Sequence, residues 1–356
     1  MGVTSESVGA ANGGGVAAAT GWSSSQHALV SLAAVVVLAA IAVAAVVLAD
    51  LRFLIGVVIP GLAFALFVFG LIWRVIRWAT APVPFRIPTT SGQQKSLPYI
   101  RNQELENPSS TLGVIGRMLL EVLFFRSLFR NTRVEVQPDR EKVSYIGSKY
   151  LWAAGLAFHW AMLIVVLRHF RFFVEPVPVW VEWLQVVDGF FQVGVPVVYL
   201  TSLIFMAGLG YLLLRRFTDP KVRYISMSAD YFPLFLLLAV GATGLLMRHF
   251  EKVDIVQVKA AIAGWASFAP VVPEGVGVMY FVHVFMVSVL LVYFPFSKLL
   301  HAPGVFLSPT RNLANTNRVK RHVNPWNPPI VGHTYAEWEE EFRDKLKASG
   351  YPLEKE

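Results

Sequence analysis

The chain alternates between long apolar runs and shorter polar segments. Because a helix that crosses a bilayer needs roughly 20 predominantly apolar residues, each long run predicts a membrane-spanning helix. The predicted helices cover residues 28–49, 53–78, 149–173, 191–214, 229–249 and 277–299. We therefore expect an all-α membrane protein with about six transmembrane helices.

The first two predicted helices form an N-terminal transmembrane hairpin over residues 28–79. Only residues 50–52 separate them. Pro60-Gly61 is expected to kink the second helix, since Pro lacks a backbone N–H and Gly lacks a Cβ. The other four helices lie within residues 149–305 and predict a separate bundle.

The polar segments predict the remaining parts of the chain. Residues 1–27 are rich in Gly, Ala and Ser and contain no Lys or Arg. They predict a disordered leader, because a secretory signal peptide begins with positive charge. Residues 80–148 predict a cytoplasmic loop. Within it, residues 111–130 mix Leu, Ile and Phe with Arg and Glu, which favours an amphipathic helix at the membrane interface or under a partner protein.

Residues 306–356 predict a cytoplasmic tail that ends in a short helix at 334–348. Apolar side chains recur there at the spacing of one helix face, at Tyr335, Trp338, Phe342 and Leu346. Exposed stripes of this kind are usually covered. We therefore expect the helix to dock on a partner or to fold back on the protein's own loops.

The positive charges indicate the orientation of the helices. Of the 31 Lys and Arg residues, 25 fall on one side of the predicted membrane and 6 on the other. Cytoplasmic loops carry the excess of Lys and Arg, so both termini and the basic loops are expected on the cytoplasmic side of the cell membrane. The short loop at 215–223, with four basic residues, gives the clearest indication.

Composition supports this class and removes several chemistries. The chain is 55% hydrophobic and 15% charged, which is typical of a multi-pass membrane protein and predicts no nucleic-acid partner. It contains no cysteine, which excludes iron–sulfur clusters, thiolate zinc sites, disulfides and covalent c-type haem. A redox centre in this chain must therefore be ligated by His, Met or oxygen atoms.

Four histidines in the apolar runs are the candidate chemistry. His159 and His169 are ten residues apart, and His283 and His301 are eighteen apart. Ionisable residues at membrane depth are usually functional. Because the two helices run in opposite directions, His169 would face His283 near the outer surface, and His159 would face His301 near the inner one. Two such pairs predict two b-type haems, each iron held by one imidazole from each helix.

The two spacings do not match on straight helices. At 1.5 Å rise per residue, the paired histidines differ in depth by about 15 Å on the first helix and about 27 Å on the second. The difference of about 12 Å must be absorbed by helix tilt, by Pro295 or by tilted haem planes.

The tripeptide Arg-His-Phe occurs twice at an outer helix end, at residues 168–170 and 248–250. Arg168 and Arg248 could each pair with a haem propionate. Alternatively, they snorkel to the membrane surface, as arginines at helix ends commonly do.

His249 has several candidate roles. It could replace either histidine of the outer pair, serve a quinone site or cap its helix, since His is favourable at a helix C-terminus. The cap and the quinone site are favoured. Surface roles are expected for the histidines outside the predicted spans, His27, His322 and His333.

Two other classes of protein could carry histidines in the membrane. A proton-coupled transporter would use them as proton relays and would have discontinuous helices and charges at mid-membrane. The predicted spans are nearly free of Asp, Glu and Lys at their centres. A structural anchor would bind nothing, which leaves the paired spacing unexplained. Haem content separates the three hypotheses.

Several motifs resemble the respiratory nitrate reductase gamma subunit family. The two histidine spacings match the spacing of that family's four haem ligands. Its last helix, second cytoplasmic loop and last outer loop resemble the runs Tyr293–His301 (YFPFSKLLH), Leu214–Phe217 (LRRF) with Pro220–Arg223 (PKVR) and Ala229-Asp230, and Gly264-Trp265-Ala266. The resemblance covers roughly residues 53–305.

This resemblance implies a five-helix dihaem b fold, to which the chain adds one N-terminal helix. It implies that His169 and His283 bind the outer haem b, and that His159 and His301 bind the inner one. Electrons would then pass between a membrane quinol of the menaquinol type and a cytoplasmic iron–sulfur partner.

The extra helix, the long loop at 80–148 and the long tail most resemble DsrM, the cytochrome b subunit of the sulfite-reduction-associated DsrMKJOP complex. There the iron–sulfur partner resembles heterodisulfide reductase (DsrK-like), and other membrane and outer-side redox subunits are present. A cytochrome b subunit of a nitrate reductase or heterodisulfide reductase is the alternative. Residues 172–200 contain no Lys, whereas the nitrate enzyme family uses a Lys of this loop at its quinone site. The quinone site is therefore expected to be built differently here.

Overall fold

The computed structural model describes residues 21–81, 93–137, 141–190, 196–316 and 331–354. Two compact units divide the chain. The first comprises residues 1–76 and 115–307, and the second comprises residues 77–114 and 308–356, each as far as it is described. Of the predicted leader, residues 1–27, the first 20 lie outside the described residues.

Six helices of the described chain are long and apolar enough to cross a membrane, so the prediction of an all-α, multi-pass membrane protein is confirmed. They are α1 Ser24–Val47, α2 Ile59–Ala79, α5 Lys149–Arg168, α7 Leu200–Thr218, α9 Ser228–His249 and α11 Val278–Tyr293. Short turns of other helix types extend three of them. The π-helix η2 Leu54–Val58 precedes α2, and the 3-10 turns η4 His169–Phe172 and η5 Phe294–Phe296 follow α5 and α11.

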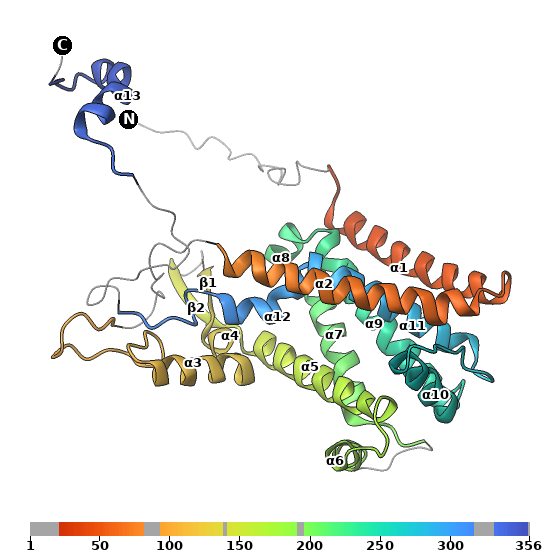
Figure 1. Ribbon diagram of the computed structural model, residues 1–356. Coiled ribbons are helices and arrows are strands. Elements are labelled where there is room, and N and C mark those ends of the chain that lie inside the picture. Colours follow the sequence, from red (N-terminus) through yellow and green to blue (C-terminus); the bar gives the residue numbers. More distant parts are fainter. Residues whose placement is uncertain (1–20, 82–92, 138–140, 191–195, 317–330, 355–356) are drawn as a thin grey trace, which may run out of the picture. The chain divides into compact units, whose positions relative to one another are not determined.

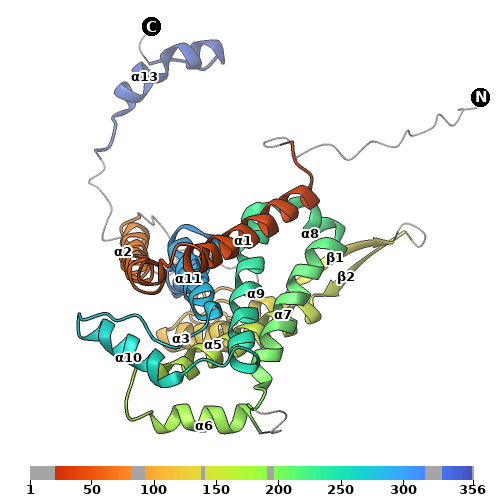
Figure 2. The same ribbon diagram turned by 90° about the vertical axis from the view of Figure 1, so that its right-hand side faces the viewer.

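Four of these helices, α5, α7, α9 and α11, pack in chain order, each against the next (Figure 1). The N-terminal helix α1 lies against α9 and α11 (Figure 2). The π-helix η2 lies against α11. Leu236, Phe281 and Met286 are fully buried where α1, α9 and α11 meet. Small residues permit close approach: a Cβ on Gly208 of α7 would lie 2.9 Å from the Cβ of Phe158 on α5. Such contacts are typical of helices packed in membranes.

The bundle has two ends, which we call the His169 end and the His301 end. Two helices at the His169 end, α6 Val179–Asp188 and α10 Ile255–Ala266, were not predicted. At ten and twelve residues they are too short to span a bilayer. The His301 end carries α8 Pro220–Ile225, the 3-10 turns η6 Lys298–Leu300 and η7 Val305–Leu307, and α12 His301–Gly304.

The first helix begins earlier than predicted, and the surface role predicted for His27 is wrong. Ser23 and Gln26 form a capping box that starts α1 at Ser24. His27 therefore lies inside the helix, is only 7% exposed, and its Nδ1 is 2.9 Å from the Oγ of Ser228. The composition of the leader hid this start, because Ser23 is the first of three consecutive serines next to a segment rich in Gly, Ala and Ser.

Helix α7 begins nine residues later than predicted, at Leu200. Pro196, which lacks a backbone N–H, stands four residues before Leu200. Tyr199, the residue before Leu200, is extended. Residues 191–195, where the helix was expected to begin, lie outside the described residues.

The single amphipathic helix predicted over residues 111–130 is two helices, α3 Thr111–Phe124 and α4 Arg126–Arg130. They are separated at Phe125, which has a left-handed backbone with φ 51°. An antiparallel hairpin that was not predicted follows, with β1 Thr132–Gln137 paired to β2 Lys142–Gly147. Its alternation of polar and apolar residues was the available signal.

In the second unit, the segment before α3 and the segment after η7 are joined by hydrogen bonds. Asn315 donates from its Nδ2 to the Oδ1 of Asn107 at 2.8 Å, and from its backbone N–H to the carbonyl of Pro108 at 2.6 Å. The predicted tail helix is present as α13 Tyr335–Ala348. It is capped by Thr334, and its Tyr335, Trp338 and Phe342 rings contact one another in sequence.

Candidate functional site

The structure brings His159 and His301 together, although they are far apart in the chain. His159 lies inside α5, and His301 begins α12. Their ring centroids are 5.9 Å apart and their planes are nearly perpendicular, at 82°. A bond between a first-row metal and an imidazole nitrogen is about 2 Å long, so two imidazoles on opposite sides of one metal have ring centres on the order of 6 Å apart.

The end of α11 explains how His301 reaches His159. The helix stops at Tyr293, two residues before Pro295, because proline cannot continue the hydrogen-bond ladder. The chain then passes through η5, an extended Ser297 with φ −122° and ψ 178°, and η6. His283 is therefore followed by ten helical residues, the same number that separates His159 from His169. Termination of the helix near Pro295 thus accounts for the difference between the two histidine spacings.

The second pair, His169 and His283, lies toward the other end of the bundle. His169 is the first residue of η4, and His283 lies in the second turn of α11. The two side chains are close enough to interact electrostatically. Gly244 of α9 lies beside the His283 ring, since a Cβ there would be 3.5 Å from its Cε1.

Each of the four imidazoles forms a hydrogen bond through its Nδ1 atom. His159 Nδ1 is 2.7 Å from the carbonyl oxygen of Gly155, and His169 Nδ1 is 2.6 Å from that of Val165. His301 Nδ1 is 2.9 Å from the carbonyl oxygen of Lys298, and His283 Nδ1 is 2.9 Å from the Oγ1 of Thr243. Within the described residues, none of the four Nε2 atoms has a hydrogen-bond partner.

This donor set fits a haem. A histidine that ligates a metal through one nitrogen usually donates its other N–H to a carbonyl or hydroxyl, which fixes the ring and its tautomer. A haem iron needs only two protein ligands, because the porphyrin supplies the rest. The described residues contain no cluster of three or more His, Cys, Asp or Glu side chains that would suit a bare metal ion. Pairs of imidazoles with free Nε2 atoms are what two haems require.

The two arginines of the Arg-His-Phe tripeptides converge at the His169 end. The guanidinium carbons of Arg168 and Arg248 lie 3.8 Å and 4.1 Å from the ring centroid of Tyr199. Arg168 forms an ion pair with Asp188 of α6, with Nε 3.2 Å from Oδ2, and both side chains are buried. Arg248 donates from Nε and Nη2 to the carbonyl of Val197 at 3.1 and 3.0 Å. The cluster holds two cations against one carboxylate.

An apolar groove of about 490 Å³ lies between α7 and α9 at the same end. Met206 of α7 and Leu246 of α9 line its walls, and His249 and Phe250 line its end. The Nε2 of His249 is buried and has no hydrogen-bond partner in the described part of the chain. The volume of the groove falls in the usual range for small-molecule sites, about 300–1,000 Å³.

The groove and the His169–His283 pair occupy opposite sides of α9. Successive residues of a helix are rotated by about 100°. Thr243 and Gly244 face His283 on α11, whereas Leu246 and His249 line the groove toward α7. A ligand in the groove would therefore be separated from His283 by the thickness of one helix, about 10 Å.

The family model for the nitrate reductase gamma subunit matches residues 114–322, which is more than half of the chain. The chain belongs to this family. The matched range contains α5, α7, α9 and α11 with all four histidines of the two pairs, whereas α1 and α2 lie outside it. The geometry described above thus occupies the part of the chain that defines membership of the gamma subunit family.

Two archaeal proteins are similar over most of their length. The "Hdr-like menaquinol oxidoreductase cytochrome b-like subunit" of Archaeoglobus fulgidus is 44% identical over 283 residues, which cover 78% of this chain and 84% of that protein. The protein of the same name from Archaeoglobus profundus is 40% identical over 277 residues, covering 76% and 82%.

Sequence reasoning missed the residues that hold the candidate ligands and arginines in place. Thr243 is an isolated hydroxyl in the apolar second half of α9, with nothing in its neighbours to connect it to His283 forty positions away. Tyr199 and Asp188 lie in a loop and a short helix between α5 and α7. The available signal was Asp188 itself, since an acidic residue in an apolar segment usually has a charged partner.

Proposed function

We propose that this gamma-family protein is a dihaem cytochrome b that links a membrane quinol to a cytoplasmic iron–sulfur subunit. The observation that carries the proposal is the pair of imidazole sites toward opposite ends of one bundle, each with Nδ1 anchored and Nε2 free. Bound haem b would supply one-electron transfer between the two ends. His169 and His283 would hold one haem, and His159 and His301 the other.

The chain's own residues would orient the ligands and set the potentials. At three sites a backbone carbonyl accepts from Nδ1–H, and at His283 the Thr243 hydroxyl takes that role. A stronger acceptor on Nδ1 makes the imidazole a better donor to iron, and burial controls the local dielectric. The two sites therefore differ in a way that would separate their redox potentials.

The α7–α9 groove would bind the quinol. Its walls are apolar and would take an isoprenoid tail, and the Nε2 of His249 would accept the proton of a quinol hydroxyl. The names of the Archaeoglobus relatives specify menaquinol, so we propose a menaquinol-type substrate. The groove uses no Lys, which agrees with the absence of Lys from residues 172–200.

Arg168 and Arg248 would contact haem propionates. Their cluster with Tyr199 carries one more cation than carboxylate, so it favours an additional anion. Asp188 already occupies one face of Arg168. We therefore propose Arg248 as the main propionate contact and Arg168 as a second one.

The excess of Lys and Arg supports placing the His301 end and both termini on the cytoplasmic side of the cell membrane. We propose that a cytoplasmic iron–sulfur subunit of the heterodisulfide-reductase type (DsrK-like) docks there and contacts α13, together with other membrane and outer-side redox subunits. A sulfite-reduction-linked complex is the preferred assembly. A nitrate reductase or heterodisulfide reductase complex is the alternative. Of these two, the word "Hdr-like" in the relatives' names favours the heterodisulfide reductase complex.

The first experiment is a reduced-minus-oxidised visible spectrum of the purified chain with a haem assay. We expect two non-covalent b haems per chain. His169→Ala or His283→Ala should remove one haem, and His159→Ala or His301→Ala should remove the other. His333→Ala is the matched control, because that histidine is exposed and belongs to the tail.

Quinol oxidation tests the groove separately. His249→Phe keeps an aromatic ring but removes the proton acceptor, so we expect two haems per chain with at least tenfold slower reduction by a menaquinol analogue. A folded protein without haem would overturn the proposal and favour a transporter. A variant lacking His249 that is reduced at the wild-type rate would overturn only the quinol site.

A further inference from the structure

His301 is held differently from the other three paired histidines. His159 and His169 are anchored to carbonyls four residues earlier, those of Gly155 and Val165, which belong to the regular ladder of α5. His301 is anchored to the carbonyl of Lys298, which belongs to η6, a three-residue turn that follows an extended Ser297. A turn of this length is not held by a helical ladder, so its orientation depends on contacts with the rest of the protein.

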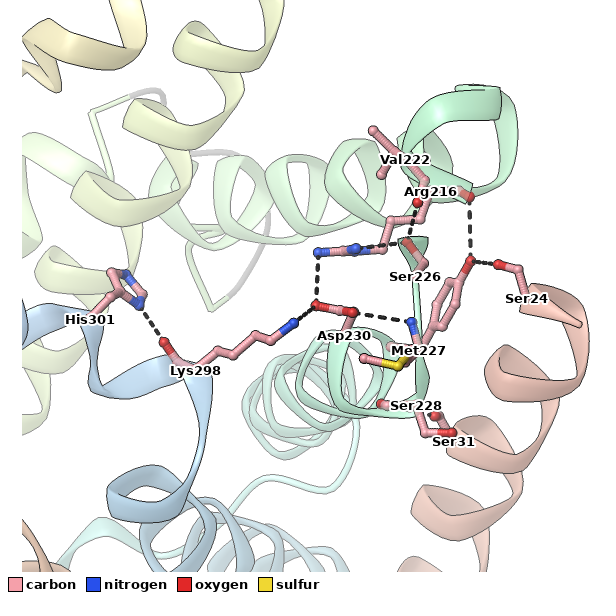
Figure 3. Close-up of polar contacts among 11 residues, drawn as sticks. Ser24, Ser31, Arg216, Val222, Ser226, Met227, Ser228, Asp230, Lys298 and His301 are labelled. Atoms are coloured by element: carbon pink, nitrogen blue, oxygen red, sulfur yellow. Dashed lines mark hydrogen bonds and ion pairs between the residues drawn. The ribbon is translucent and has the colours of Figure 1, made fainter. Parts of the chain in front are cut away.

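One contact between this turn and the rest of the protein is an ion pair with Asp230. Lys298 Nζ donates to Asp230 Oδ1 at 2.7 Å (Figure 3). The Asp230 side chain is only 9% exposed although it lies near the start of α9, and Arg216 of α7 approaches the same Oδ1 with its Nη2 at 3.7 Å. Asp230 also accepts the backbone N–H of Met227 through Oδ2 at 3.1 Å. One carboxylate thus connects α7, α9 and the segment after α11.

Further hydrogen bonds brace the residues around Asp230. Arg216 donates from Nη1 to the Oγ of Ser226 at 2.9 Å. Its carbonyl accepts from the hydroxyl of Tyr231, whose oxygen is also 2.7 Å from the Oγ of Ser24 on α1 (Figure 3). The position of the carboxylate is therefore fixed by three transmembrane helices, and the Lys298 side chain connects it to the turn before His301.

We propose that Asp230 is a positioning residue for His301. Through Lys298 it fixes the turn whose carbonyl accepts from the His301 imidazole, and so it sets the orientation of this ring relative to His159. This inference rests on the proposed function, because it assumes that the two imidazoles share one haem iron. Asp230 touches neither imidazole and acts only through Lys298.

The substitution Asp230→Asn separates this role from helix capping. An Asn amide oxygen can still accept the N–H of Met227, so the start of α9 is retained, but the charge that holds Lys298 is lost. Lys298→Met removes the other half of the ion pair. It leaves the backbone carbonyl that accepts from His301 in place, and the Lys298 side chain is 64% exposed, so the fold should tolerate the change. Lys298→Arg restores the charge.

Asp219 provides a matched control at the same end of the bundle. It caps α8 by accepting the N–H of Lys221, and it pairs with Arg215, with Oδ2 3.5 Å from Nη2. Asp219→Asn therefore keeps a helix cap but removes an ion pair, as Asp230→Asn does, without altering any contact of η6.

The experiment compares both haems of the full-length protein by low-temperature EPR and by potentiometric titration of the b-haem bands. We expect Asp230→Asn and Lys298→Met to shift the g values and the midpoint potential of one haem, the one that His301→Ala removes. The other haem of these two variants should keep the wild-type g values and midpoint potential. Both haems of Lys298→Arg and of Asp219→Asn should also match those of the wild type. Two unshifted haems in both ion-pair variants would overturn the inference, as would an equal shift in Asp219→Asn.

Failure of the proposed function would look different, because the wild-type protein itself would then contain no haem. If Asp230→Asn does not fold, Lys298→Met decides the question alone. Its two haems would either differ from the wild type only at the His301 site, which supports the inference, or match it throughout, which overturns it.

Discussion

Removal of the Asp188 carboxylate should destabilise the His169 end of the bundle. In Asp188→Asn the amide oxygen can still accept the N–H of Thr201, a bond of 2.7 Å to Oδ1 in the wild type. The amide nitrogen, however, would face Arg168, and two guanidiniums would remain around Tyr199 without a carboxylate. The ion pair is deeply buried, with side-chain exposures of 9% for Arg168 and 3% for Asp188.

Breaking a buried ion pair by removing one partner typically costs about 3–5 kcal/mol. For a domain of this size one kcal/mol corresponds to about 2 °C in the midpoint of thermal unfolding, so we expect a decrease of about 6–10 °C. The assay is thermal unfolding of the detergent-solubilised protein, followed by tryptophan fluorescence. Arg168→Met combined with Asp188→Asn should recover part of the loss, because the unpaired cation is then absent as well.

The control is Asp50→Asn. Asp50 pairs with Arg52 at 3.1 Å, but both side chains are exposed, at 84% and 52%. Exposed pairs contribute about 0–1 kcal/mol, so the midpoint should change by less than about 2 °C. If Asp188→Asn were as stable as this control, the buried ion pair would not stabilise the bundle and the reasoning would be wrong.

Three further changes test other parts of the structure. Thr243→Val removes the hydroxyl next to His283 Nδ1 with little change in volume, so haem affinity at that site should fall about 10–100-fold, as measured by haem retention during dilution, while the other haem stays bound; equal retention at both sites would argue against the Thr243 contact. Gly208→Val places a Cβ 2.9 Å from that of Phe158 and should lower the free energy of unfolding by about 1–3 kcal/mol, as measured by thermal unfolding. Gly210→Val should lower it by less, because an added Cβ at Gly210 has no neighbour within 4 Å. Gly61→Leu would collide with the indole of Trp265, and Trp265→Ala should restore part of the lost stability in the double variant, a recovery that would be absent if α10 did not pack on α2.

The fold class was predictable because it depends on local sequence. All six spanning helices occur close to their predicted positions, since lipid offers no hydrogen-bond partners and an apolar run of sufficient length must form a helix. The errors occur where a capping side chain or the backbone conformation of a single residue decides the boundary. The Ser23 cap, the extended Tyr199 and the left-handed Phe125 each change the chain within one or two residues.

The sequence selected the candidate histidines but not the residues that hold them. The ten- and eighteen-residue spacings were enough to select His159, His169, His283 and His301. The conflict between the two spacings could not be resolved without knowing that α11 ends at Tyr293. Pro295 was one of several explanations that the sequence allowed.

The sequence by itself determined the helices, the histidine spacing and the positions of the charges, because each of these is a property of neighbouring residues. The tertiary structure decided which side chains meet: Thr243 with His283, Asp230 with Lys298, and His27 with Ser228, which is 201 positions away. Such contacts depend on the rotation and tilt of each helix, which are set by the packing of small residues and by neighbouring helices. No local pattern records that rotation, so the residues that orient the candidate histidines became visible only in the folded bundle.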